Sequence, residues 1–310
     1  MKKTILIFII ILITVFCILT FLDYKGRYIA ERNLWHINKK LEEIVKDPKA
    51  VPDTAFYKVV REYEDFIKEF PNSELVPIAD MLLARAYIAK KDYEQARSIL
   101  FQLIKKYPNN SKVEIRALAE IANIYAMENK WNKVINTYDV VLRKYPYTPL
   151  GMRIPMMKAE VYIKKNNKEK AKEQIKNAIK YYSNIVNKKQ NTVVGLNAML
   201  LIASCHESLG DNQETINTLE ETFNKFADSG LLTPNMVIGI VRHINTISLA
   251  KMGNLDIAIN VYNRFIKKHP NHPFNKIFSE IIGQLKHIEK QLNKKQSSKT
   301  KTKVEAGVTK

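Results

Sequence analysis

Apolar positions spaced by three and four residues, as in amphipathic helices, alternate along this chain with short polar breaks. Three breaks carry an aromatic residue directly before a proline, Phe70-Pro71, Tyr107-Pro108 and Tyr145-Pro146, and His269-Pro270 takes the equivalent place later. Proline cannot continue a helix and biases the preceding residue away from helical angles, so each pair marks a helix end. The steps of 37 and 38 residues between the first three prolines are typical of helical-hairpin repeats. The pattern therefore predicts an all-α chain.

Small and large residues also recur at fixed places within these units. The first helix of each unit presents a small residue and, three positions later, a large one, so both lie on one face. The small residue lets the two helices of a hairpin approach closely, and the large one fills the gap to the next hairpin. Because one hairpin cannot bury its apolar face alone, the units are expected to stack. The pairs are Ala84 and Tyr87, Ala122 and Tyr125, Ala159 and Tyr162, and Ala203 and His206; the second helices carry Ala96, Val134, Ala171 and Ala258.

This spacing resembles the tetratricopeptide repeat, whose pattern runs Trp-x2-Leu-Gly-x2-Tyr, then Ala-x3-Phe, then Pro. The resemblance covers residues 74–270 and implies a right-handed α-solenoid that binds other proteins. The fifth unit fits worst, because Leu249 stands where the Tyr is expected. The Phe-Pro-Asn-Ser and Tyr-Pro-Asn-Asn breaks are similar to those of bacterial envelope members of the outer-membrane assembly and Tol-Pal-associated type. The first Trp is missing, and its place is taken by Asp80, Leu118, Pro155, Met199 and Arg242.

The helical pattern divides the chain into five parts. Residues 1–23 are expected to form a signal-anchor or transmembrane helix, and residues 24–73 a degenerate leading hairpin. Residues 74–273 hold five repeats. Residues 274–292 carry apolar side chains at helical spacing and are expected to cap the last hairpin. Residues 293–310 are rich in lysine without apolar periodicity, which predicts a disordered basic tail.

The N-terminal segment predicts a membrane anchor. Lys2 and Lys3 precede residues 4–22, which carry no charge and would span roughly 28 Å as a helix. A cleavable signal peptide would need small residues at the cut, and none follow the apolar run. Phe16 before Cys17 also disfavours a lipoprotein signal, which has a small residue there. We expect a single-pass protein of the bacterial inner membrane whose body is extracytoplasmic. Because Lys25, Arg27 and Arg32 follow the C-terminal end of the apolar segment, a cytoplasmic body stays an alternative.

The chain is strongly basic, with 50 Lys and Arg against 31 Asp and Glu, a net charge of +19. Such a charge can attract anionic lipid, cell-wall polymer or nucleic acid. The excess is spread along the chain and accompanied by many Asn and Ile residues, which favours compositional bias and solvated helix faces. We therefore expect no specific nucleic-acid partner and at most a weak contact of the basic tail with anionic lipid or polymer.

Catalytic motifs are missing from the sequence. It contains no glycine-rich phosphate loop, no Gly-x-Ser-x-Gly and no Cys-x-x-Cys. His269 and His272 are close in sequence but lack nearby Asp or Cys residues that would complete a metal site. We expect no enzyme activity, no cofactor and no metal.

The first helices of stacked hairpins line a groove, and the repeat register indicates which side chains face it. Apolar and Met residues there alternate with a few charged ones, a mixture that suits an extended or helical segment of a partner protein. The competing interpretation is that some of these residues, the Ile residues above all, only pack between helices. The predicted groove residues are Met81, Arg85, Ile88, Arg116, Asn123, Met127, Arg153, Met156, Glu160, Asn197 and Ser204.

These observations favour a membrane-anchored scaffold for protein–protein interaction or complex assembly in the bacterial cell envelope. The first alternative keeps the same fold but faces the cytoplasm, as a membrane adaptor. The second is a basic protein that binds anionic cell-wall polymer or lipid, and its binding would weaken steeply with salt.

Overall fold

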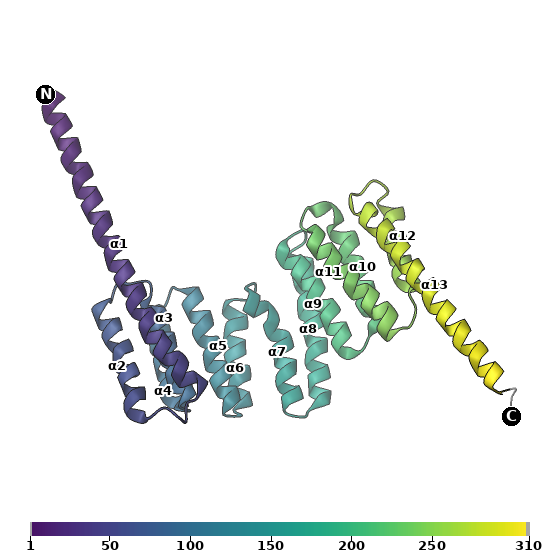
Figure 1. The fold of residues 1–310 in the computed structure, drawn as a ribbon, viewed down its shortest axis with the longest axis horizontal. Coiled ribbons are helices and arrows are strands. Elements are labelled where there is room, and N and C mark those ends of the chain that lie inside the picture. The colour runs from purple at the N-terminus through teal and green to yellow at the C-terminus, as the bar shows by residue number, and fades with distance from the viewer. Residues whose placement is uncertain (1, 308–310) are drawn as a thin grey trace. The chain divides into compact units, whose positions relative to one another are not determined.

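The computed structural model describes the backbone of residues 2–307 and the side chains of residues 9–20 and 26–292 (Figure 1). Every regular element between residues 2 and 307 is helical. The helices form hairpins that pack in succession, which confirms the predicted all-α solenoid. The chain divides into two compact units, residues 1–146 and residues 147–310.

The N-terminal unit contains six helices within the described residues. α1 contributes a stripe of buried side chains, Ala30, Leu34, Ile37, Leu41 and Ile44, at the spacing of one helix face. This stripe packs on α2 and α3 in a common core. The helices are α1 (Lys2–Lys46), α2 (Asp53–Glu69), α3 (Val76–Ala89), α4 (Tyr93–Lys106), α5 (Ser111–Met127) and α6 (Trp131–Lys144).

The C-terminal unit continues the hairpins and ends in a long single helix, α13. Phe278 of α13 is fully buried; its ring stacks on Tyr262 at 5.2 Å and meets Phe265 edge to face at 4.9 Å between centroids, so α13 covers the end of the last hairpin. The elements are α7 (Pro149–Lys164), α8 (Lys168–Lys188), α9 (Val193–Leu209), α10 (Asn212–Phe226), a short 3-10 turn (Ala227–Ser229), α11 (Pro234–Thr246), a π-helix (Ile247–Lys251), α12 (Asp256–Lys268) and α13 (Phe274–Gly307).

In the first four repeats, the first helix ends on a left-handed residue four positions after its aromatic residue or histidine. Lys91, Asn129, Asn166 and Gly210 have φ of 64°, 57°, 54° and 81°. In each case the next backbone N–H donates to the carbonyl of that aromatic or His residue, at 2.8–2.9 Å. This pairing satisfies carbonyls at the helix end and turns the chain into the second helix.

The π-helix explains the poor fit of the fifth repeat. A π-turn inserts one extra residue, so the sequence register before it shifts by one position. Val241, 4% exposed, therefore takes the buried place of Leu118 and Met199, and the expected Arg242 faces solvent instead. The extra residue also leaves Leu249, 42% exposed, outside the core.

Both terminal helices cross the predicted boundaries without a break. α1 continues through residues 23 and 24, and α13 continues past residue 292 to Gly307, where the sequence predicts a disordered tail. Adding a residue to an existing helix is far less costly than starting one, and residues 284–306 contain no Gly or Pro. The side chains of residues 293–310 lie outside the described part.

The predicted membrane span, residues 4–22, falls partly on side chains that the structure does not describe, those of residues 4–8 and 21–22. Across the described residues, no helix holds a stretch long and apolar enough to cross a membrane. The side chains of residues 9–20 are all exposed.

Candidate functional site

α3 and α5 are the first helices of two successive hairpins and contact each other through small side chains. Ala84 on α3 and Ala117 on α5 are buried in one cluster with Ile121. The two helices also border a cavity of about 420 Å³. It is lined by Ile78, Met81, Leu82, Ala84, Arg85 and Ile88 of α3 and by Arg116, Ala119 and Glu120 of α5.

The α3/α5 cavity combines an apolar wall with unpaired charges. Met81 and Ile88 are half-buried, while Arg85 and Arg116 extend to solvent. Neither arginine forms an ion pair or hydrogen bond with another described residue, and the same holds for Glu120. A guanidinium group presents several N–H donors in a planar fork that matches a carboxylate. The cavity can therefore hold an apolar side chain and a carboxylate of one ligand.

A buried carboxylate holds α5 against the next helix. Glu114 accepts hydrogen bonds from Lys144 Nζ at 2.5 Å and from Tyr145 Oη at 2.6 Å. Burial alone would raise the pKa of Glu114, but these two hydrogen bonds outweigh it and hold the pKa below its ordinary value. Glu114 lies on the first turn of α5, close to Arg116, so this contact fixes the helix that carries one wall of the cavity.

Four of the predicted groove residues meet in this cavity: Met81, Arg85, Ile88 and Arg116. Asn123 and Met127 lie on the same face of α5 as Arg116 by helical spacing, exposed and outside the cavity. The sequence prediction missed Leu82 and Glu120, which also line it. The prediction assumed that each helix lines the groove with one row of residues three or four positions apart. A groove between two helices is also lined by residues next to that row. Leu82 and Glu120 could have been found as the neighbours of Met81 and Ala119.

The remaining predicted residues belong to the C-terminal unit. Arg153 and Glu160 are exposed on α7, and Asn197 and Ser204 are exposed on α9. Met156 is half-buried, and its sulfur lies 3.1 Å from the thiol of Cys205. Met156 therefore packs between α7 and α9, as the competing interpretation of the apolar positions holds.

The reactive side chains of the chain occupy structural positions. Burial raises the pKa of the Cys205 thiol to about 12, so this group is protonated at neutral pH. His269 stacks on Phe265 at 4.7 Å, and the Nε2 of His272 lies 3.2 Å from the carbonyl of Ala227. Among the residues that the structure describes, no group of three or more His, Cys, Asp or Glu side chains could hold a metal ion.

Several solved structures are similar to the chain. A tetratricopeptide repeat protein from Parabacteroides merdae is 13% identical, over 82% of this chain and 99% of that chain, with a TM-score of 0.34. A thermophilic TPR protein from Thermus thermophilus is 15% identical, over 67% and 98%, with a TM-score of 0.34. YrrB, a TPR protein with an unusual peptide-binding site, is 14% identical, over 70% and 97%, with a TM-score of 0.29.

Family models place the repeats directly on the sequence. Three models, each described as a tetratricopeptide repeat, match residues 63–121, residues 156–185, and residues 197–229 with 247–272. No curated protein matches the chain. Proteins with this repeat generally bind other proteins or peptides as scaffolds without catalysis. The matched residues of the chain carry tetratricopeptide repeats.

Proposed function

We propose that this chain is a membrane-tethered scaffold that holds a partner protein in the α3/α5 cavity and serves complex assembly in the bacterial cell envelope. One observation carries the proposal: the cavity joins an apolar wall to two arginines, Arg85 and Arg116, that have no partner among the described residues. A cavity of about 420 Å³ has room for one large side chain and its neighbours.

The lining favours a partner segment that is partly apolar and acidic. Met81 has a flexible, polarizable side chain that adapts to different apolar groups. Arg85 and Arg116 would bind a carboxylate at the rim, where it stays partly solvated, so the charge pair would add specificity more than affinity. An amphipathic helix or an extended segment can supply both groups at the required spacing.

Crosslinking in living cells tests this proposal. A photoreactive amino acid at Ala119, inside the cavity, is expected to capture a partner, whereas the same amino acid at Lys176, exposed on α8, is the matched control. Arg85→Glu combined with Arg116→Glu should reduce the Ala119 crosslink about tenfold or more, because both carboxylate contacts become repulsive. Equal crosslinking at both positions, or a crosslink that survives the charge reversal, would contradict binding at this cavity.

The tether is proposed to be residues 4–22 in the inner membrane, with the repeats on the extracytoplasmic side. The side chains described in this segment support it, because large apolar groups such as Leu12 and Phe16 are 61% and 66% exposed. Leaving an apolar side chain in water costs about 1.5–3 kcal/mol, and a lipid bilayer would remove that cost for the whole run. Similarity of the N-terminus to bacterial export signals favours the outward orientation.

Fractionation and a fusion enzyme test the tether. The full chain should stay in the membrane pellet after alkaline carbonate extraction, and deletion of residues 1–23 should release it. Alkaline phosphatase fused after residue 310 is expected to be active, because it folds only outside the cytoplasm. An inactive but intact fusion would favour a cytoplasm-facing adaptor, and a full chain extracted by carbonate would refute the anchor.

A further inference from the structure

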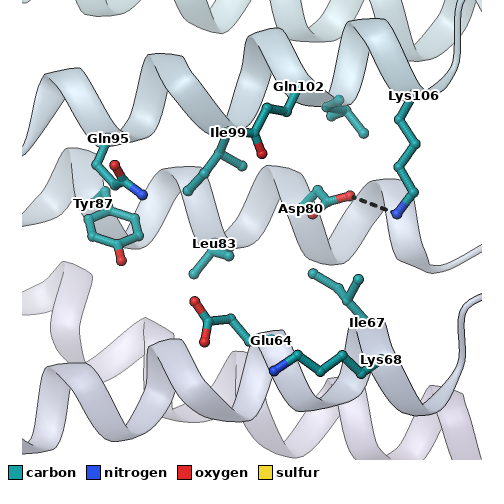
Figure 2. Close-up of a pocket in the computed structure, with 11 residues that line it drawn as sticks. Glu64, Ile67, Lys68, Asp80, Leu83, Tyr87, Gln95, Ile99, Gln102 and Lys106 are labelled. Carbon is teal, nitrogen blue, oxygen red and sulfur yellow. Dashed lines mark ion pairs between the residues drawn. The ribbon is translucent and has the colours of Figure 1, made fainter.

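Figure 2 shows a second cavity, whose α3 residues lie on the other face of that helix from those of the α3/α5 cavity by helical spacing. Its volume is about 480 Å³, and it runs between α2 and α4 with α3 as its floor. The floor residues Asp80, Leu83 and Tyr87 follow helical spacing on the face of α3 opposite to Arg85. α2 supplies Glu64, Ile67 and Lys68, and α4 supplies Gln95, Ile99, Gln102, Leu103 and Lys106.

Charged side chains lie at both ends of this α2/α4 cavity, and Lys68 of its lining reaches back toward Glu64 (Figure 2). At one end Asp80 pairs with Lys106 at 4.0 Å, the dashed contact in Figure 2. At the other end Tyr87 lies beside Gln95, and the carboxylate of Glu64 points into the cavity (Figure 2). Glu64 forms no ion pair or hydrogen bond with any described residue. Leu83 and Ile99 make the middle apolar.

The next two repeats show what lies over the tyrosines that correspond to Tyr87. The ring of Tyr125, which corresponds to Tyr87, is covered by the guanidinium of Arg97 at 5.1 Å and by the ammonium of Lys133 at 5.3 Å. The ring of Tyr162 is covered by Lys165 at 5.7 Å and Lys170 at 5.9 Å. In both repeats the chain's own cations cover the aromatic ring.

Tyr87 lacks such a cation among the described residues. Gln95 stands where Lys133 and Lys170 stand in the other repeats, one position before the small residue of the second helix. Lys90, which corresponds to Lys165, is bound to the carbonyl of Val51 at 2.8 Å and lies over Phe56 instead.

The surroundings of Tyr87 are electronegative. Burial and the neighbouring carboxylate of Glu64 raise the pKa of the Tyr87 hydroxyl. The same negative potential attracts a cation to the ring face, where the quadrupole of the ring adds a further attraction. Phe56 meets the ring of Tyr87 edge to face, with the ring centroids 5.5 Å apart, and no cation of the described residues takes the place that a lysine fills in the two other repeats.

We propose that the α2/α4 cavity binds a segment of a partner protein that places a lysine or arginine over Tyr87, beside Glu64. An apolar side chain of the same segment lies on Leu83 and Ile99, which separate the two ends of the cavity. This site shares no lining residue with the α3/α5 cavity. The two sites prefer ligands of opposite charge, because the α2/α4 cavity binds a cation and Arg85 with Arg116 bind a carboxylate. The N-terminal unit can therefore hold two partners at once, one on each side of α3.

Peptide selection with the full chain in detergent tests this site. Random dodecapeptides displayed on phage are selected on the wild-type protein, and the affinities of the recovered peptides are measured by fluorescence anisotropy. Gln95→Lys restores the lysine of the other repeats, so we expect it to cover Tyr87 and weaken basic peptides about tenfold without lowering the unfolding temperature. Glu64→Gln should weaken the same peptides severalfold, and Arg85→Glu, on the other side of α3, should leave them unchanged.

The outcomes distinguish the two cavities. Peptides weakened by Gln95→Lys but not by Arg85→Glu, and enriched in a basic and an apolar residue, support the proposal. Peptides with the reverse sensitivity belong to the α3/α5 cavity and support only the proposed function. A selection that yields no basic peptide sensitive to Gln95→Lys overturns the second site.

Discussion

Gly195 and Gly239 lie in two helices of the C-terminal unit, and the same substitution by alanine is expected to act on them in opposite directions. Gly195 is buried in the first turn of α9, and its N–H donates to Thr192 Oγ1 at 3.1 Å. The loop before α9 closes tightly there, because Thr192 Oγ1 also donates to the carbonyl of Lys189 at 2.8 Å. A methyl group at Gly195 would lie far inside van der Waals contact with that carbonyl oxygen.

The backbone oxygen cannot rotate away as a flexible side chain could. Relief needs a shift of the loop that carries Lys189, and overpacking of this kind costs about 1–3 kcal/mol. Gly239 is exposed within α11, and a methyl group there meets no atom within 4 Å. Alanine should stabilise that helix by about 0.5–1 kcal/mol, because glycine loses more backbone freedom on folding.

Thermal unfolding followed by circular dichroism at 222 nm measures the difference. For a unit of this size each kcal/mol shifts the midpoint by about 2–4 °C, so Gly195→Ala should lower it by about 2–12 °C and Gly239→Ala should raise it by about 1–4 °C. Both tryptophans, Trp35 and Trp131, lie in the N-terminal unit, so their fluorescence reports that unit separately. A Gly195→Ala protein with the wild-type midpoint would refute the close packing at the start of α9.

Three other substitutions test the packing and the turns. Glu114→Gln should cost about 1–3 kcal/mol at pH 7, because it removes the charge that Lys144 and Tyr145 hydrogen-bond. Since the folded pKa of Glu114 lies below its ordinary 4.5, the wild type loses this stability as the pH falls through the folded pKa, and urea titrations of the variant should show a flatter decline below pH 4.5. Lys91→Gly should raise the free energy of unfolding measured by urea titration by about 0.5–1 kcal/mol, because Lys91 has φ of 64°. Tyr182→Phe should lower the free energy of unfolding by about 1–3 kcal/mol, seen as a lower thermal midpoint, since its buried hydroxyl donates to a backbone carbonyl at 2.6 Å. A flat response to any one of these changes would show that its contact does not stabilise the fold.

Local chemistry made much of the fold predictable. Proline after an aromatic residue ends a helix whatever surrounds it, so the hairpin boundaries near Pro71, Pro108 and Pro146 follow from the sequence alone. The small residues Ala84, Ala122 and Ala203 are buried at 1% exposure each, as their helical spacing predicts. The fifth repeat was misaligned, because the fixed spacing of the other repeats places Arg242 at a buried position, whereas the π-helix adds one residue and puts Val241 there.

The groove was only partly predictable for the same reason. Helical spacing places Arg85 and Arg116 on the faces of two first helices, and the structure adds that they line one cavity. The same spacing cannot tell a groove position from a packing position, and Met156 proved to contact Cys205. That distinction depends on the distance between neighbouring helices, which the side chains of both set together.

The sequence by itself determined that this chain folds into tetratricopeptide-type hairpins, because periodicity, small residues and prolines act within one or two turns of a helix. Only the tertiary structure decided which faces stay open. Tyr87, Tyr125 and Tyr162 are alike in the sequence pattern, yet cations from the chain cover two of them and leave the third facing a cavity. Whether a ring is covered depends on side chains from three helices meeting in space, and Gln95 in place of a lysine acquires its meaning only there.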